Sequence, residues 1–403
     1  MKQVGSADLA LMGGSIPHWL FERMKGLSLA IVEAILTEYG HKMLLTKLSD
    51  PFWFQSFGAV IGMDWNSSGV TTAVTRALKA AINPHVKELG LYVCGGKGKQ
   101  SLKTPAELLY LADQTGLDGQ YLVRCSKLAA KVDNTALQDG FQLYLHNFIV
   151  SDQGDWVVIQ QGMRPEDKRA RRYHWHAEAV TSFVNEPHAA VCGNYQGEIL
   201  NLVASEAQAT QKGILAITQE SPEKILREIK QMQLPQYCKV KTKDVNLKRL
   251  GSILWLAQAT QTDDFEELLL LKGLGPRTLQ SLTLVSEVIH GTPSRFSDPA
   301  RFSIAHGGKR SRPFPVPTYV YDETVSTLKK AVDLAKIGQK EKQKAIQQLT
   351  TIAQKAEENF QPEDNLEKLI EKEQKESWQY GGRTNKGFVK QPSSKQLRLF
   401  DES

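Results

Sequence analysis

The chain has 403 residues, a hydrophobic content of 41% and a formal net charge of +6. A chain of this length can bury the cores of two or three domains. Its apolar runs, such as Leu268 to Leu271, are too short to span a membrane. Neither a signal peptide nor paired cysteine spacing is evident, so we expect a cytoplasmic protein with reduced thiols and no membrane partner.

Residues 1 to about 120 are predicted to be mainly helical. Apolar residues from Trp19 onward recur close to a 3.6-residue period, and this pattern predicts a helix that starts at Pro17 and ends at Gly40. Two further helices are expected near residues 50–61 and 71–82.

A glycine-rich loop follows a short strand predicted near residues 89–94. Its sequence is Gly95-Gly96-Lys97-Gly98-Lys99, without the spacing of a Walker loop. Glycines leave N–H donors accessible and lysines add charge, so Lys97 and Lys99 are candidates for a flexible contact with DNA phosphate. An ordinary surface loop would explain the segment equally well.

From about residue 121 the hydrophobic period changes to two. Segments 141–150 and 156–160, separated by a polar turn, predict a β-hairpin. Polar residues gather in and before it, and metal-dependent nucleases collect carboxylates and a lysine at one end of a sheet in this way. Such a nuclease would use Mg²⁺ or Mn²⁺, and ordinary strand-end residues are the alternative. The candidate catalytic residues are Lys131, Asp133, Asp139 and His146.

The segment 168–176 combines cations with aromatic residues, as surfaces that bind single-stranded nucleic acid do. Arg171 and Arg172 are therefore candidates for DNA binding. The alternative is a solvated loop beside a core tryptophan, Trp175.

Residues 203–290 are predicted to form helices near 205–218, 222–232, 245–259, 264–271 and 276–290. The connection Gly273-Leu274-Gly275-Pro276-Arg277-Thr278 resembles a helix-hairpin-helix. A Gly-x-Gly turn reverses the backbone tightly and Pro276 suits the first helical position. Free N–H groups at such a turn bind DNA phosphate without reading sequence, and Gly273, Gly275, Arg277 and Thr278 are the candidates.

The same region resembles the helix-hairpin-helix DNA glycosylases. That family has a Gly-x-Pro turn and a catalytic Asp after the hairpin, and this chain has Gly291-Thr292-Pro293 and Asp298. Arg277 stands where the bifunctional members carry a Lys, so the resemblance implies a monofunctional enzyme in which Asp298 stabilises a cationic sugar. Capping of a helix before Pro299 is the alternative for Asp298.

Several longer motifs resemble a domain-of-unknown-function family, number 763, found in bacteria and archaea. The resemblance extends to about residue 335 and implies no established activity. The motifs are Pro17-His18-Trp19-Leu20, Asp50-Pro51-Phe52-Trp53-Phe54-Gln55, Gly62-Met63-Asp64-Trp65-Asn66-Ser67-Ser68-Gly69, Gly95-Gly96-Lys97-Gly98-Lys99 and His306-Gly307-Gly308-Lys309.

The C-terminus carries Gln396-Leu397-Arg398-Leu399-Phe400. This peptide resembles the one with which bacterial replication and repair proteins bind the sliding DNA clamp, where the Gln makes hydrogen bonds and the Leu-Phe pair fills an apolar pocket. Gln396, Leu397, Leu399 and Phe400 are the candidate clamp-binding residues. The preceding segment has few apolar residues and is expected to be a flexible tail.

These patterns predict an α+β protein. We expect a mixed α/β domain with a β-hairpin (1–200), an all-helical domain with the helix-hairpin-helix (201–322), charged helices (323–380) and the tail (381–403). The expected function is DNA binding in repair or replication, with a DNA-processing nuclease first. A glycosylase, a non-catalytic accessory factor that binds a DNA structure, and a role on RNA are the alternatives.

Overall fold

A computed structural model describes residues 9–10, 16–63, 68–166, 169–231, 247–300, 318–358, 383–384 and 387–388. The chain divides into two compact units, Met1–Gln354 and Lys355–Ser403. In the second unit, the short strands β10 (Arg383–Thr384) and β11 (Gly387–Phe388) pair antiparallel. The combination of helices with antiparallel sheets confirms the predicted α+β class.

The first unit is built on an antiparallel sheet with the strand order β1-β6-β5-β4-β2, and β7 pairs with β6. The predicted hairpin is confirmed as β4 and β5, with Val150 opposite Trp156. Next to it, β6 places Arg172 opposite Gln161. The strands are β1 (Leu9–Ala10), β2 (Leu91–Lys97), β4 (Gln142–Ser151), β5 (Trp156–Arg164), β6 (Arg169–His176) and β7 (Ala190–Cys192).

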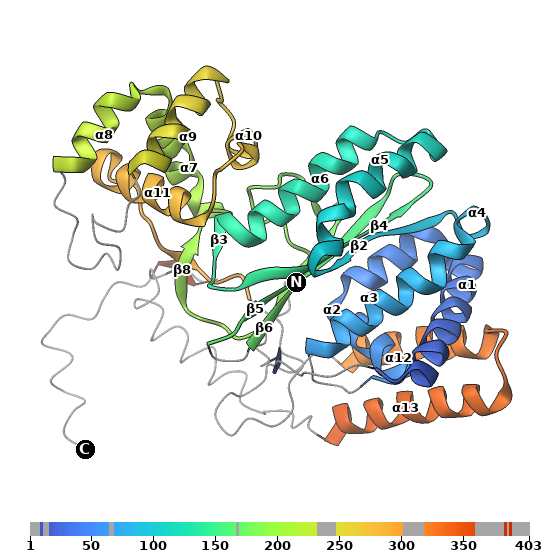
Figure 1. Cartoon of the computed structure of the whole chain (residues 1–403). Coiled ribbons are helices and arrows are strands. Elements are labelled where there is room, and N and C mark those ends of the chain that lie inside the picture. The colour runs from blue at the N-terminus through green and yellow to red at the C-terminus, as the bar shows by residue number, and fades with distance from the viewer. Residues whose placement is uncertain are drawn as a thin grey trace, which may run out of the picture. The chain divides into compact units, whose positions relative to one another are not determined.

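Helices cover both faces of this sheet (Figure 1). On one face Ile149 and Ile159 join the apolar cluster of α1 (His18–Ser49), α2 (Pro51–Val60) and α3 (Ser68–Ile82). On the other face Phe148 and Val158 join that of α5 (Thr104–Thr115) and α6 (Gly119–Lys131). Because both faces are covered, the central strands bury successive residues instead of alternating between core and solvent.

The helix α1 continues beyond its predicted end. At Gly40 the backbone has φ 76° and ψ 179°, so the predicted helix stops there and a second helical segment runs on to Ser49. Asp50 then caps α2 by accepting hydrogen bonds from Phe52 N at 2.7 Å and Trp53 N at 3.2 Å. Pro51 occupies the first position of α2, where its missing N–H does no harm.

The helical part from α7 to α11 shares its core with the sheet. Ile214, Leu254 and Leu282 belong to the same apolar cluster as Trp175 in β6. A short ladder of β3 (Leu137–Gln138), β8 (Glu198–Asn201) and β9 (Phe296–Ser297) runs between the two parts. The helices are α7 (Gln208–Gln219), α8 (Pro222–Gln231), α9 (Leu247–Ala259), α10 (Phe265–Leu270) and α11 (Pro276–His290), close to the predicted ranges.

The charged helices predicted after residue 322 are α12 (Thr318–Leu334) and α13 (Gln339–Glu358). Their weak apolar stripe supplies Leu328, Val332 and Leu349 to the cluster of α1–α3. In the described ranges no helix combines the length and the apolar content that a membrane crossing needs.

Candidate nucleic-acid interface

The connection between α10 and α11 has the backbone of a tight helical hairpin. Asp264 caps α10 by accepting from Glu267 N at 3.1 Å. Gly273 has φ +93°, a conformation that favours glycine, and Leu274 is buried beneath the turn. The first bond of α11 runs from Leu279 N to Gly275 O at 3.0 Å, so the N–H groups of its first turn precede that bond and need other partners.

Side chains from three other elements hold the carbonyl groups of this turn. Arg249 on α9 donates to Gly273 O from Nε at 3.3 Å and from Nη2 at 3.2 Å. At the end of α6, Lys131 Nζ donates to Leu274 O at 2.6 Å. Gln138 Nε2 on β3 donates to Pro276 O at 2.7 Å. The turn is thereby fixed through its acceptors and through the N–H of Leu274, which donates to Leu271 O at 3.1 Å.

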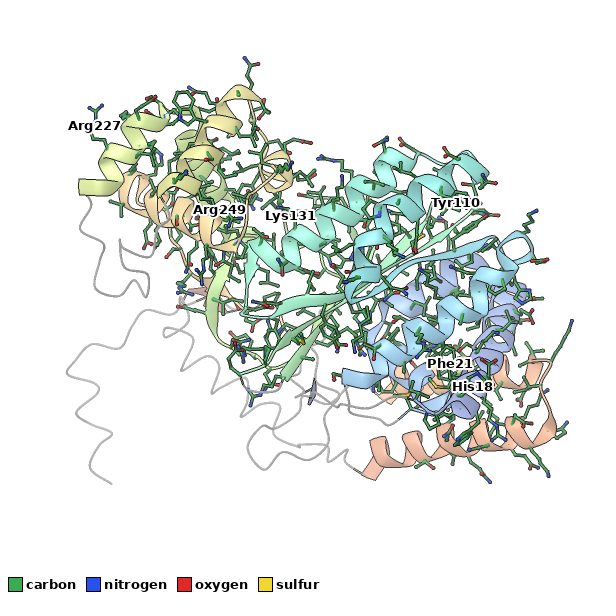
Figure 2. The ribbon with its side chains drawn as sticks, in the orientation of Figure 1. His18, Phe21, Tyr110, Lys131, Arg227 and Arg249 are labelled. Carbon is green, nitrogen blue, oxygen red and sulfur yellow. The ribbon has the colours of Figure 1, made fainter. Side chains whose placement is uncertain are left out.

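Positive charge gathers around the turn. Figure 2 shows Lys131 and Arg249 at neighbouring positions, and burial followed by repulsion from Arg249 lowers the pKa of Lys131. Lys272 and Arg277 are exposed on the turn itself. Thr278 is buried, so its side chain is not part of this surface, although its N–H lies in the first turn of α11. The hairpin combines helix N–H groups with cations, which is the chemistry that binds phosphate.

Asp139 and Asp298, expected at catalytic positions, bind Arg171 inside the protein. Arg171 Nη1 donates to Asp139 Oδ2 and to Asp298 Oδ1, both at 2.9 Å, and Nη2 donates to Asp298 Oδ2 at 2.8 Å. The three side chains have 0% exposure. Tyr173 OH donates to Asp139 Oδ2 at 2.7 Å, and Gln196 N donates to Asp298 Oδ2 at 2.9 Å.

This cluster of Asp139, Arg171 and Asp298 leaves no carboxylate open to a metal ion or a sugar. Burial raises the pKa of Asp139 in spite of the neighbouring guanidinium. Both carboxylates also accept backbone N–H groups, from Phe141 and Ala300, at 3.0 Å each. The arrangement does not correspond to a glycosylase carboxylate in an open site, because Asp298 is buried and forms an ion pair.

Asp133 and His146 lie in a second buried network. His188 Nε2 contacts Asp133 Oδ1 at 2.5 Å, and Gln160 Nε2 and Trp175 Nε1 donate to Asp133 Oδ2 at 2.5 and 2.9 Å. Asp133 belongs to a single π-helical segment, Val132–Ala136, after α6. Burial raises the pKa of its carboxyl group.

His146 joins this network through the amide of Gln160. Its Nδ1 lies 2.8 Å from Gln160 Oε1, which can only accept, so Nδ1 carries the proton. Its Nε2 therefore accepts from Ser126 Oγ at 2.8 Å. Burial lowers the pKa of His146 to about 4, and the ring is neutral near pH 7. Within the described part of the chain, no three His, Cys, Asp or Glu side chains converge in a way that could hold a metal ion.

The glycine-rich segment is the regular end of a strand and not an irregular loop. Its first three residues belong to β2 and pair with β4, and 3₁₀ turns at Gly98–Lys103 follow. Lys79 Nζ donates to Gly95 O at 2.8 Å and to Glu107 Oε2 at 2.8 Å. A Cβ at Gly95 would lie 2.2 Å from His146 O, so only glycine fits there. Lys97 and Lys99 are exposed, as a phosphate contact requires.

The family model described as "Protein of unknown function (DUF763)" matches residues 5–316. The chain belongs to this family. The resemblance expected from the sequence motifs is thus confirmed, and the match includes the whole sheet and the hairpin. No curated protein and no solved structure matches the chain.

In this DUF763 chain, Arg171 and Arg172 are buried and do not form the basic surface expected for segment 168–176. The described residues of that segment form β6, a strand between β5 and β7 with helices over both faces. Both arginines have 0% exposure. The surface role expected for them does not agree with these positions, because neither guanidinium is exposed on the surface.

Arg172 is held differently from Arg171. Its Nη1 donates to Gln55 Oε1 at 3.2 Å and to Thr71 Oγ1 at 3.4 Å. Its guanidinium carbon lies 4.8 Å from the ring centroid of Phe54. Its Nε and Nη2 are buried without a hydrogen-bond partner in the described structure. Burial has the largest effect on the pKa of Arg172 and lowers it.

The sequence did not reveal which residues bind the hairpin, nor which residues bind Arg171 and Arg172 in the core. Arg249 and Gln138 lie far along the chain from the turn they bind, and no local pattern marks them. The period-two order of segment 169–176 could have revealed a strand, because Tyr173 and Trp175 fall on one face. The residues expected to bind a clamp, Gln396, Leu397, Leu399 and Phe400, lie outside the described residues, as does His306-Gly307-Gly308-Lys309.

Proposed function

We propose that this protein binds DNA through phosphate contacts at the hairpin between α10 and α11. The observation that carries the proposal is the asymmetry of the turn. Donors from α6, α9 and β3 take up its carbonyl groups, while the N–H groups at the start of α11 lie beside exposed Lys272 and Arg277. A fixed set of N–H donors with nearby cations suits a phosphate of the backbone and carries no information about bases.

The second part of the proposal concerns recruitment. The terminal peptide Gln396–Phe400 would bind the bacterial sliding clamp and bring the hairpin to replicating or repaired DNA. Its support is the sequence of the peptide. An apolar Leu-x-Leu-Phe segment of this kind is suited to a groove on a partner.

We propose a non-catalytic accessory role in preference to a nuclease or a glycosylase. The carboxylates expected to act in catalysis, Asp133, Asp139 and Asp298, are buried with partners inside the protein. A nuclease reading would be supported by Mg²⁺- or Mn²⁺-dependent cleavage of labelled single-stranded or flapped DNA. Alkali-labile sites in damaged duplex DNA would support the glycosylase reading instead.

The test of the hairpin uses Gly275→Ala and Arg277→Glu. Gly275 has φ −131° and ψ 176°, and a Cβ there would meet only Arg249 Nη2, at 3.7 Å. The alanine is therefore compatible with the fold but stands where a phosphate would approach. Fluorescence anisotropy with duplexes of several sequences should show weaker binding of all of them by a similar factor. Loss of one phosphate contact should also flatten the salt dependence by about one unit of slope.

The matched control is Lys87→Glu, the same charge reversal at an exposed lysine on α4 (Val86–Leu89), outside the hairpin. It should weaken binding less than Arg277→Glu does. Equal effects of the two charge reversals would show that Arg277 affects DNA binding only through the net charge of the protein. Unchanged DNA affinity of both hairpin variants would refute the proposal. The same duplexes made of RNA measure whether the site distinguishes the two nucleic acids.

A further inference from the structure

Arg172 is a buried cation in neutral surroundings. The described groups that contact it are an amide, a hydroxyl, an aromatic ring and a thiol, from Gln55, Thr71, Phe54 and Cys192. Burial raises the pKa of the Cys192 thiol to about 11, so this group is uncharged near pH 7. A guanidinium removed from water without a counter-charge is strongly unfavourable, and neutral hydrogen bonds compensate for only part of the loss.

Arg171, the preceding residue in β6, is a buried arginine with a structural role. Arg171 projects from the other face of β6 and meets two carboxylates, Asp139 and Asp298. Arg172 is equally buried but has no such partner in the described structure. Its Nη2 is without a hydrogen-bond partner, and so are its Nε and the Nε of Arg171. Among the described residues, Arg172 therefore lacks the counter-charge that Arg171 has.

The free atoms of Arg172 have the arrangement that binds an oxyanion. Nε–H and Nη2–H lie on one edge of the planar guanidinium and can donate to two oxygens of the same group. The first turn of α3 lies beside the guanidinium, because Thr71 Oγ1 accepts from Arg172 Nη1, the nitrogen outside this edge, and Ser68 O accepts from Gln161 Nε2 at 3.1 Å. The N-terminus of this 15-residue helix adds partial positive charge.

A line of polar side chains connects Arg172 with the surface. Gln161 stands opposite Arg172 in the sheet and donates to Tyr144 OH at 2.6 Å. Tyr144 is half-buried, at an irregularity where the register of β4 against β5 shifts. The exposed Lys97 places its Nζ 5.8 Å from the ring centroid of Tyr144. Bulged strands often lie next to binding sites, where they redirect a side chain.

We propose that Arg172 binds a phosphate group between β6 and the first turn of α3, and that Lys97 and Tyr144 mark its entrance. The group is either a free phosphate ion or a terminal phosphate of a nucleic-acid strand, since both present the same oxygens to the guanidinium. This site is separate from the hairpin and does not depend on DNA binding there.

The test measures phosphate binding by the full chain with ³¹P NMR and thermal unfolding, with chloride keeping the ionic strength constant. Wild type should bind inorganic phosphate and show a melting temperature that rises with its concentration. Arg172→Met should lose the phosphate-dependent rise, and in phosphate-free buffer it should be at least as stable as wild type, since it removes an uncompensated charge. Arg172→Lys, which keeps the charge but not the two-donor edge, should bind at least about tenfold more weakly.

Arg277→Glu is the control and should keep the full phosphate effect, because it alters only the hairpin. A 5′-phosphorylated oligonucleotide that competes with phosphate better than its 5′-hydroxyl counterpart identifies a strand end as the source, and equal weak competition identifies the free ion. If wild type shows no saturable binding of phosphate, the proposal is refuted whether or not the variants fold. An equal loss of stability by Arg172→Met with and without phosphate would also overturn it, since that is the behaviour of a purely structural arginine.

Discussion

Arg171 and Asp298 form an ion pair of two hydrogen bonds, 2.9 and 2.8 Å long, between residues 127 positions apart in the chain. The pair connects β6 to the end of β9, and it is closed to solvent on both sides. Asp298 therefore has a structural partner in the position where the glycosylase resemblance placed a catalytic group. Its removal should affect folding before it affects any chemistry.

We expect Asp298→Ala to lower the free energy of unfolding by about 3–5 kcal/mol, because it leaves the guanidinium of Arg171 with a single buried carboxylate. Urea unfolding at neutral pH measures this change. Asp263→Ala removes an exposed carboxylate and should remain within about 0.5 kcal/mol of wild type. Similar losses in the two variants would show that the buried pair contributes little.

The neutral ring of His146 should make stability depend on pH. Burial lowers its pKa to about 4 from the ordinary 6.5, so the unfolded chain binds the proton more readily than the folded one. The stabilisation is complete above about pH 6.5 and is lost as the pH falls towards 4, by about 3 kcal/mol in total.

This loss should be smaller in His146→Leu, and the difference between the two unfolding curves isolates one proton. The comparison is needed because burial also lowers the pKa of His174, and raises those of Asp133 and Asp139, which act in the opposite direction. His85→Gln, at an exposed histidine, serves as the control and should leave the pH dependence as in wild type. Parallel curves for wild type and His146→Leu would contradict the assignment.

The glycines of the hairpin should respond differently to alanine. Gly273 has φ +93°, so Gly273→Ala should cost about 1–3 kcal/mol of stability through backbone strain. Gly275 has extended backbone and free space, and Gly275→Ala should be close to neutral in stability. Thermal unfolding of the two variants provides the measurement, and a larger loss for Gly275→Ala would contradict the described turn.

Lys131→Met should loosen the hairpin without removing an exposed charge from it. The change leaves Leu274 O without its donor, and we expect a loss of about 1–3 kcal/mol together with faster amide exchange in the turn. Lys127→Met is the matched control, because Lys127 lies four residues earlier on α6 and is exposed. Hydrogen exchange that is equally slow in both variants would show that the Lys131 contact does not hold the turn.

The terminal peptide should bind the bacterial clamp with a dissociation constant of about 1 μM, near −8 kcal/mol. Replacing Leu399 and Phe400 with alanine should abolish this binding, because an apolar anchor in such a groove contributes roughly 2 kcal/mol or more. Calorimetry of the intact chain, the double variant and a chain ending at Lys395 provides the test. Lys395→Ala is the control that should bind normally, and equal binding by the shortened chain would refute the role of the peptide.

Local patterns predicted much of the fold. The hairpin of β4 and β5 followed from alternation and a polar turn, and α11 from Pro276 after Gly275. β6 was missed as a strand because its charges suggested a surface. Whether a charge is buried depends on partners such as Asp298 and Gln55, which approach from distant parts of the chain and leave no trace in the local sequence.

Some residues of the candidate site could likewise be predicted from the sequence, and others could not. The hairpin motif is continuous in sequence, so Gly273, Gly275 and Arg277 could be recognised together. The donors that fix its carbonyl groups, Arg249 and Lys131, come from other helices and required the tertiary structure. The grouping of Asp133, Asp139 and His146 followed only from proximity in sequence, and the structure assigns Asp139 to a different network from the other two.

The hairpin and the sheet share one apolar core, which limits how this part of the chain can be divided in evolution or by protein engineering. Leu268 and Leu282, from the two helices of the hairpin, lie in one cluster with Trp175 of the sheet. A fragment that starts after residue 203 would keep the hairpin between α10 and α11 but would expose the apolar surface that the strands now cover, and such a surface promotes aggregation. The smallest portable piece is therefore the first unit as a whole, and we expect natural gene fusions to join partners at its ends instead of cutting between sheet and hairpin.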